Sequence, residues 1–180
     1  MGFLDAYGAF DADQAIAYLT DDAIAEISGW AVANTREELR LELALLEAQG
    51  YAQIVTGCEP QGNSSSGTEV RCAYDFHGIR SHEIGLGPYS DNYWDLTVRD
   101  GEIVSVANTI AFMTNGFSQQ MWEPFAQWVA MKYPDDVLRM YDNGGQTDFR
   151  LTEESVQLWE QRSRKYVDEV GQSAEEGTSP

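Results

Sequence analysis

The two histidines of the chain and one aspartate are the side chains best suited to proton transfer. His77 and His82 lie five residues apart around Gly78, and Asp95 lies in an otherwise apolar and aromatic stretch, residues 93–96. If His77 and Asp95 face one cavity, the imidazole can take a proton while the carboxylate fixes its tautomer. We therefore treat these two as the catalytic candidates.

The alternative for this pair is purely structural. A strand histidine is commonly hydrogen-bonded or at the surface, and a strand aspartate commonly pairs with a base. Asp75 shares a strand face with His77 and is, with Asp95, a candidate for an acid that faces the interior. The bases that could pair with Asp95 are Arg71, Arg80 and Arg99.

Aromatic residues are the second set from which a site can be built. They are numerous enough to line a pocket for a flat or polycyclic ligand, although each could equally belong to the ordinary core. The ligand-binding candidates among them are Trp30, Tyr74, Tyr93, Trp94 and Trp122.

The sequence gives no support for a metal or a cofactor. The histidines, cysteines and acids lack the tight spacing of metal ligands, such as two histidines one helical turn apart. Neither a phosphate-binding glycine loop nor a nucleophile elbow occurs. We therefore expect no metal and no cofactor.

Charge excludes two classes of partner. The chain has 180 residues, with 11 basic against 30 acidic side chains and a net charge of −19. Nucleic-acid binders and proteins on anionic membranes need a basic face, so neither partner is expected. The acids are spread along the chain, which indicates a solvated acidic shell. Such a shell suits a neutral or cationic ligand better than an anionic one.

Cys58 and Cys72 are too few for a disulfide framework. They fall on two strands that are expected to pair and could face one another, but buried free thiols are the expected state. The first base is Arg36, so no secretory signal is expected, and no apolar stretch reaches the length of about 18 residues that a membrane span needs. These observations predict a cytoplasmic protein.

Local signals predict helices towards both ends of the chain. Thr35 and Glu38 form a capping box that starts the clearest helix, and Gly50 is suited to end it. The segment 117–133 is apolar around most of its circumference, so it is buried or covered by a partner, and Pro134 ends it. The expected helices are two short ones within residues 3–19, broken near Asp11, and longer ones at 35–50, 117–133 and 152–170.

Strand signals fill the middle of the chain. The expected strands are residues 23–27, 51–58, 68–77, 82–86, 93–99 and 102–112. Residues 60–67 are polar and rich in Gly and Ser, which predicts a long mobile hairpin loop. Asp100-Gly101 predicts a tight type I′ hairpin turn. The sum is an α+β fold with a curved antiparallel sheet of five or six strands.

Three motifs in this order resemble the nuclear transport factor 2-like superfamily. They are residues 10–16 (FDADQAI) running into 19–23 (LTDDA), residues 98–104 (VRDGEIV), and Phe76-His77-Gly78, which is similar to the SnoaL-like polyketide cyclase branch. The resemblance implies a cone-shaped sheet wrapped around N-terminal helices, with an apolar cavity open at one end. The expected parts are a cone domain at 1–112, a helical extension packing on it at 113–170, and a disordered tail at 171–180.

The resemblance leaves the function open, because such cavities serve enzymes, small-molecule binders and interaction modules. Many relatives carry an Asp on the last strand, and the resemblance places Asn108 at that position. Asn cannot act as a general base, but it can hold a carbonyl or enolate oxygen by hydrogen bonding. We therefore add Asn108 to the ligand-binding candidates.

Two hypotheses follow. The first is a cofactor-independent cyclase, isomerase or dehydratase, in which His77 and Asp95 act as acid and base while Tyr74 and Asn108 orient a neutral, mostly apolar substrate. The second is a non-catalytic protein that binds a small hydrophobic molecule or another protein through the cone and the Trp-rich helix 117–133. That helix would either deepen the pocket or form the interface of a homodimer.

Overall fold

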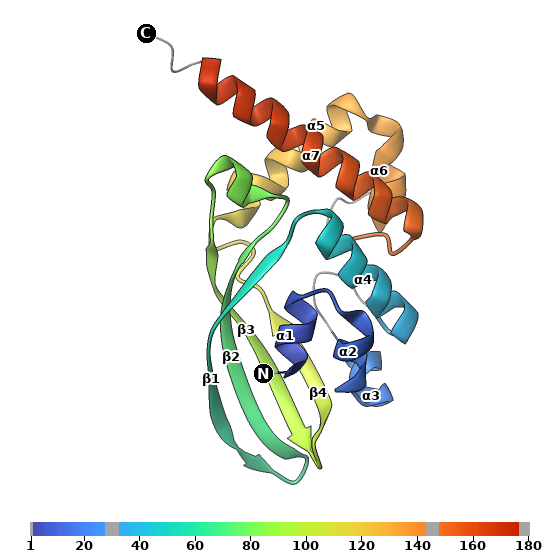
Figure 1. Cartoon of the computed structure of the whole chain (residues 1–180), viewed down its shortest axis with the longest axis vertical. Coiled ribbons are helices and arrows are strands. Elements are labelled where there is room, and N and C mark those ends of the chain that lie inside the picture. Colours follow the sequence, from blue (N-terminus) through green and yellow to red (C-terminus); the bar gives the residue numbers. More distant parts are fainter. Residues whose placement is uncertain (1, 28–32, 143–147, 177–180) are drawn as a thin grey trace.

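Helices precede and follow a single sheet, as an α+β fold requires. The computed structural model describes residues 2–27, 33–142 and 148–176. Figure 1 shows a long, curved sheet with the N-terminal helices beside it and the C-terminal helices across one end. The N-terminal helices are α1 (Gly2–Gly8), α2 (Ala12–Ala17), α3 (Asp21–Glu26) and α4 (Arg36–Ala48).

Local capping signals start the N-terminal helices. The Asp11 side chain accepts a hydrogen bond from the backbone N–H of Gln14 and starts α2. The Thr35 hydroxyl accepts one from the N–H of Glu38, which confirms the expected start of α4. Gly50 follows α4 with φ of +69°, the left-handed conformation that commonly ends a helix.

The described sheet has four antiparallel strands in the order β1-β2-β3-β4, fewer than the five or six expected. Residues 60–67 do not form a loop, because β1 and β2 continue as a hairpin to a two-residue turn at residues 65–66. Asp100 and Gly101 both have positive φ, which confirms the expected β3–β4 turn. The strands are β1 (Ala52–Ser64), β2 (Gly67–His77), β3 (Tyr89–Arg99) and β4 (Glu102–Thr109).

Two expected strands are helical, which accounts for the smaller sheet. Residues 23–27 fall largely in α3, because the Thr20 hydroxyl caps the N–H of Ala23 and two aspartates occupy the first turn. Residues 82–86 overlap the short 3₁₀ helix η1 (Ser81–Ile84). Arg80 and Gly85 flank η1 in left-handed conformations, and this geometry cannot continue a strand.

The C-terminal extension contains more helices than expected. Pro134 starts a helix instead of only ending one, since its fixed φ and missing N–H suit a first helical turn. The last helix runs to Glu176, into the segment expected to be a disordered tail, and residues 177–180 lie outside the described part. The elements are the π-helix η2 (Ser118–Trp122), α5 (Glu123–Lys132), α6 (Pro134–Met140) and α7 (Glu153–Glu176).

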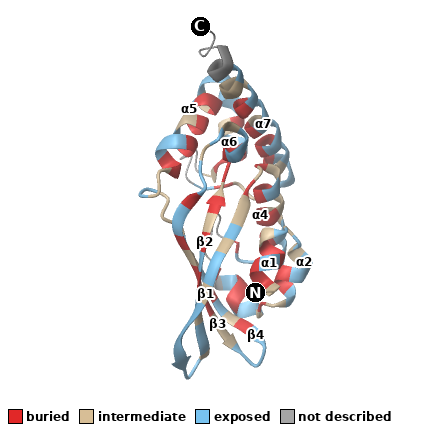
Figure 2. Ribbon diagram, turned by 60° about the vertical axis from the view of Figure 1, so that its left-hand side comes forward, coloured by how far each residue is buried: buried red, intermediate tan, exposed pale blue. Residues whose placement is uncertain are grey.

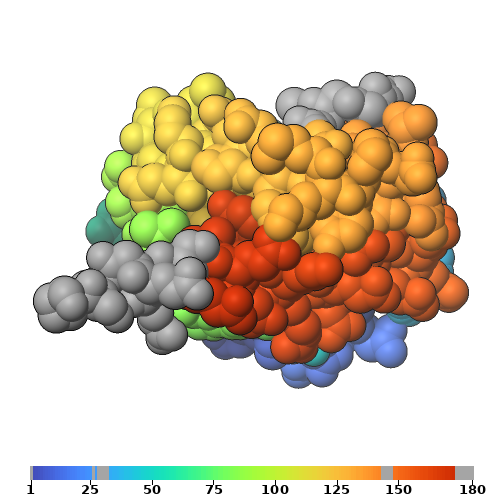
Figure 3. Space-filling model, turned by 90° about the horizontal axis from the view of Figure 1, so that it is seen from above, coloured from blue at the N-terminus to red at the C-terminus, as the bar shows by residue number. Residues whose placement is uncertain are grey.

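Aromatic packing within the chain buries this extension. Trp122 contacts the rings of Trp159 and Phe149, and α7 packs against α4, α5 and α6. Figure 3 looks down on this end and shows the yellow-to-red C-terminal segments covering most of it. Phe117 reaches Phe76 of the sheet, with ring centroids 5.1 Å apart. None of the described helices combines the length and apolar character that a membrane span needs.

Cys58 of β1 and Cys72 of β2 stand opposite each other in the register and form a disulfide. Their Cα atoms are 4.0 Å apart. The expectation of two free thiols is therefore wrong. Strand alternation alone could not decide this, because pairing depends on a register that only the folded hairpin defines.

Candidate functional site

The helix-covered face of the sheet carries a cluster of buried aromatic side chains. The inward-facing residues Tyr74 and Phe76 of β2 and Trp94 of β3 are at most 1% exposed. Phe3 and Tyr7 of α1 lie against the indole of Trp94, with ring centroids 5.9 and 5.0 Å from it. Figure 2 shows buried residues both in helices such as α1 and α4 and in the strands. Side chains of the protein itself thus fill this part of the interior.

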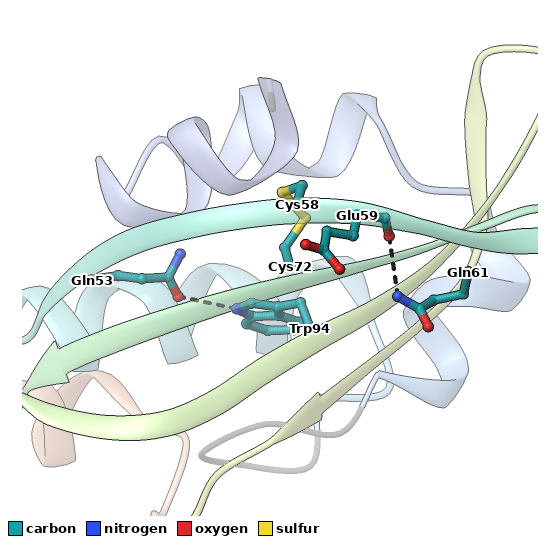
Figure 4. The surroundings of a disulfide bond; sticks show 6 residues. All are labelled: Gln53, Cys58, Glu59, Gln61, Cys72 and Trp94. Atoms are coloured by element: carbon teal, nitrogen blue, oxygen red, sulfur yellow. Dashed lines mark hydrogen bonds between the residues drawn. A yellow bond between two sulfur atoms is a disulfide. The ribbon is translucent and has the colours of Figure 1, made fainter.

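Gln53 of β1 brings an amide group into this aromatic cluster. Its Oε1 accepts hydrogen bonds from Trp94 Nε1 at 3.1 Å and from the Tyr51 hydroxyl at 3.4 Å. Because an indole N–H can only donate, the amide oxygen must face Trp94, and Nε2 points away from it. Figure 4 shows this orientation. Gln53 Nε2 is buried and has no hydrogen-bond partner among the described residues.

Tyr74 and Asn108 form a second polar contact beside Trp94. The Tyr74 hydroxyl donates to Asn108 Oδ1 at 2.7 Å, and Asn108 pairs directly with Trp94 across β3 and β4. Asn108 Nδ2 is buried and likewise without a partner in the described part of the chain. The structure therefore brings together Tyr74, Trp94 and Asn108 from the predicted ligand-binding set.

A buried carboxylate also lies in the interior, next to the aromatic cluster. Glu42 of α4 is 1% exposed, and its Oε1 accepts a hydrogen bond from the Tyr7 hydroxyl at 3.2 Å. Burial raises the pKa of Tyr7 well above its ordinary value, and the Glu42 charge adds to the shift. Burial also raises the pKa of Tyr74. Both hydroxyls therefore stay protonated at neutral pH and serve as hydrogen-bond donors.

Our reading of the sequence missed Glu42, Gln53 and Tyr7. The signal for Glu42 was present, because it lies three residues after Leu39 and directly before Leu43, on the apolar stripe of the helix. A carboxylate on a buried helix face is unusual and calls for a partner. The positions of Gln53 and Tyr7 depend on how α1 packs on β1, for which local sequence carries no signal.

An open groove of about 530 Å³ lies between α1 and β1 and reaches Gln53 from outside. Gly8 leaves room there, since a Cβ at this position would lie 4.0 Å from Gln53 Nε2. The groove residues are Leu4, Asp5, Gly8 and Ala9 from the α1 side, and Gln53, Val55, Thr56 and Gly57 from β1.

The predicted pair of His77 and Asp95 is not formed. Asp95 pairs in register with Arg71, and from there to His77 is six residues along β2, or about 20 Å at about 3.3 Å per residue. The Arg71 guanidinium binds both carboxylate oxygens of Asp95, at 2.7 and 2.8 Å, on the outer face of the sheet. Asp95 therefore has the structural role that was the alternative.

His77 is held by the loop that follows β2. Its Nδ1 lies 3.0 Å from the carbonyl oxygen of Leu86 and 3.2 Å from Ser81 Oγ. Because a carbonyl oxygen can only accept, Nδ1 carries the proton. His82 lies next to it, with ring centroids 5.6 Å apart. His77 therefore orders the end of β2 through the loop that follows it.

The remaining predicted residues do not join the site. Tyr93 lies on the outer face, with the Arg71 guanidinium 3.9 Å from its ring centroid. Trp122 belongs to the core of the C-terminal helices. Trp30 lies outside the described residues. In the described ranges, no group of three or more His, Cys, Asp or Glu residues could hold a metal ion.

The chain is therefore an α+β protein whose N-terminal helices fill the concave side of a curved antiparallel sheet. Solved structures similar to it include a nuclear transport factor 2-like protein of unknown function from Cytophaga hutchinsonii, with 14% identity, 62% of this chain and 85% of that chain covered, and a TM-score of 0.44. A candidate polyketide cyclase from Pseudomonas putida has 15% identity, 66% and 92% coverage, and a TM-score of 0.47.

A third similar structure is a hypothetical protein with a ketosteroid isomerase-like fold from Catenulispora acidiphila, solved in complex with trimethylamine. It has 13% identity, 66% and 88% coverage, and a TM-score of 0.44. No family model and no curated protein matches the sequence. The names of these structures include the group that the sequence motifs resemble.

Proposed function

We propose that the protein binds a small, neutral or cationic organic molecule in the groove between α1 and β1. The observation that carries the proposal is Gln53, which lines this groove and whose buried Nε2 has no acceptor among the described residues. A buried donor without a partner costs about 1–3 kcal/mol. A ligand that presents a carbonyl or hydroxyl oxygen would recover this free energy.

The groove has the size and composition of a ligand site. Its volume of about 530 Å³ lies within the range of about 300–1,000 Å³ typical of small-molecule pockets. Apolar and small residues such as Leu4, Val55 and Gly8 alternate with a few polar groups. This mixture favours an organic molecule with one or two oxygen atoms.

The charge of the groove and of the whole chain favours a ligand that is not an anion. None of the groove residues is basic, and Asp5 is the charged residue among them. The chain as a whole carries a net charge of −19. An anion would therefore meet repulsion both in the groove and on approach, whereas a neutral or cationic molecule would not.

The positions of the catalytic candidates favour a binding function over catalysis. His77 and Asp95 are remote from one another, and the interior hydroxyls of Tyr7 and Tyr74 act as neutral donors. An interaction role for the Trp-rich helix has no support, because α7 of the same chain covers Trp122 and Phe125.

Binding of Nile red, a neutral fluorescent dye with a carbonyl oxygen, tests the proposal. Gln53→Met removes the donor and is expected to weaken binding about three- to tenfold, the value of one hydrogen bond. Gly8→Ala places a methyl group over Nε2 and is expected to weaken binding too.

The matched control is Gly171→Ala, a second helical glycine whose Cβ would meet open space. This variant is expected to bind Nile red like the wild type. Equal affinity of all three variants and the wild type would place the dye elsewhere and refute the groove as the site.

A further inference from the structure

The disulfide lies in the least regular part of the edge strand β1. The register of β1 against β2 shifts between Val55 and Gly57 and again between Pro60 and Gly62. Cys58 pairs with Cys72 between these two irregularities. Pro60 has no N–H for the ladder, and a glycine inside a strand weakens it. The backbone ladder is therefore interrupted on both sides of the disulfide.

Open space adjoins this segment of β1 on both faces of the sheet. The groove reaches Val55, Thr56 and Gly57 on one side of β1, and a second hollow of about 340 Å³ reaches Thr56, Gly57 and Glu59 on the other. A Cβ added at Gly57 would meet nothing within 4 Å. β1 also lies at the edge of the sheet, with β2 as its partner in the strand order. The segment has space to move on both faces.

The disulfide therefore fixes the part of β1 that lines the groove. Thr56 and Gly57, which line the groove, directly precede Cys58. Figure 4 shows the disulfide bridging the two strands near Trp94, whose indole N–H donates to Gln53. Without the bond, a weak ladder interrupted by two irregularities would remain, and such strands are prone to slip in register.

We propose that the thiol–disulfide state of Cys58 and Cys72 controls the conformation of β1 over residues 54–62 and, through it, access to the groove. The link to ligand binding rests on the proposed function. Cys58 is half-buried, so a small dithiol can approach it, whereas Cys72 is 2% exposed. Reduction transfers two electrons and two protons from the dithiol, which breaks the S–S bond, leaves two thiols and closes the dithiol into its own disulfide.

Hydrogen exchange of the full chain, with and without dithiothreitol, tests the control of β1. Reduction is expected to speed amide exchange in residues 54–62 by about tenfold or more, with little change in α7. The double variant Cys58→Ser, Cys72→Ala is expected to exchange like the reduced wild type and not to respond to dithiothreitol. If that variant does not fold, the comparison of oxidised and reduced wild type still decides the question.

Two results would overturn the control of β1. One is equal exchange of residues 54–62 in both redox states, and the other is two alkylatable thiols in protein purified without reductant. Nile red affinity is measured on the same samples and is expected to differ by about threefold or more between the states. Equal affinity in both states would refute the control of the groove. Absence of dye binding in both states would refute the proposed function, while the exchange data would still decide the role of the disulfide.

Discussion

At the residue scale, burial sets the chemistry of the tyrosine hydroxyls. The pKa values of Tyr7, Tyr74 and Tyr141 are all raised, and desolvation by burial is the largest cause for each. For Tyr7 the charge of Glu42 acts in the same direction. A phenol held protonated in this way is a fixed donor, which explains why it can sit beside a carboxylate in the interior.

These raised pKa values predict alkaline instability. The folded protein keeps protons that the unfolded chain releases near the ordinary tyrosine value of 10.0. The protonated hydroxyls therefore contribute fully to the free energy of unfolding below that pH. This contribution is lost as the pH rises further. Urea midpoints measured from pH 9 to pH 11 are expected to fall. Tyr7→Phe is expected to start from a lower midpoint, because Glu42 loses one hydrogen bond, and then to fall less steeply. Parallel curves for the two proteins would contradict the prediction.

Asp95 shows that residue type alone does not define the role of a strand carboxylate. The carboxylate interrupts an apolar stretch, which indicated a special role, and that role is an ion pair with Arg71 on the half-exposed outer face. Strand alternation shows which residues share a face but does not show which face is covered. The alternative of a salt bridge was the better physical reading.

At the element scale, Arg80 in the loop after β2 joins α4 to α7 and η1. Its guanidinium donates to the Ala48 carbonyl oxygen at the end of α4, to Ser163 of α7 and to Glu83 of η1. Gly50 leaves room for the Arg80 side chain, because a Cβ at Gly50 would lie 2.6 Å from Arg80 Cγ. The end of α4 therefore depends on a glycine for both its backbone conformation and its space.

Gly50→Ala is expected to destabilise the protein. The substitution combines a positive φ, which disfavours alanine, with a clash against Arg80. The expected loss in free energy of unfolding is more than about 1 kcal/mol, measured by urea denaturation. Gly171→Ala is the control, since a helical glycine in open space gains up to about 1 kcal/mol on replacement by alanine. Equal stability of both variants would show that Arg80 moves aside freely.

The secondary structure of short apolar segments was the hardest to predict from the sequence. Residues 23–27 suit a strand or a helix by composition, and the N-cap at Thr20 with α3 packed on β4 decides for a helix. Residues 35–50 were predicted well, because a capping box, a long apolar stripe and a terminal glycine all agree.

At the scale of the whole molecule, charge is the dominant property. Acids outnumber bases by 30 to 11, and many of the bases sit in exposed ion pairs such as Arg36–Asp21 and Arg40–Asp13. Exposed pairs contribute at most about 1 kcal/mol each. Repulsion among the remaining carboxylates therefore opposes the compact state.

Added salt is expected to stabilise the protein. Raising sodium chloride from about 0.1 to 1 M shortens the Debye length from about 10 Å to about 3 Å, which screens repulsion between carboxylates. The melting temperature should rise by several degrees across this range. Sucrose at the same osmolality should give a smaller rise, because it does not screen charge. A fall of the melting temperature in salt would show that the exposed ion pairs outweigh the repulsion.

The sequence by itself determined the acidic character, the α+β order of elements, the capped helix at 35–50 and the Asp100-Gly101 hairpin. Each of these depends on residue types close together in the chain, where spacing and capping carry the information. Only the tertiary structure decided that Trp94 has both Gln53 and Asn108 as neighbours, that Cys58 bonds to Cys72, and that His77 and Asp95 stay apart. These outcomes depend on strand register and on the packing of α1, which are set by contacts between distant segments.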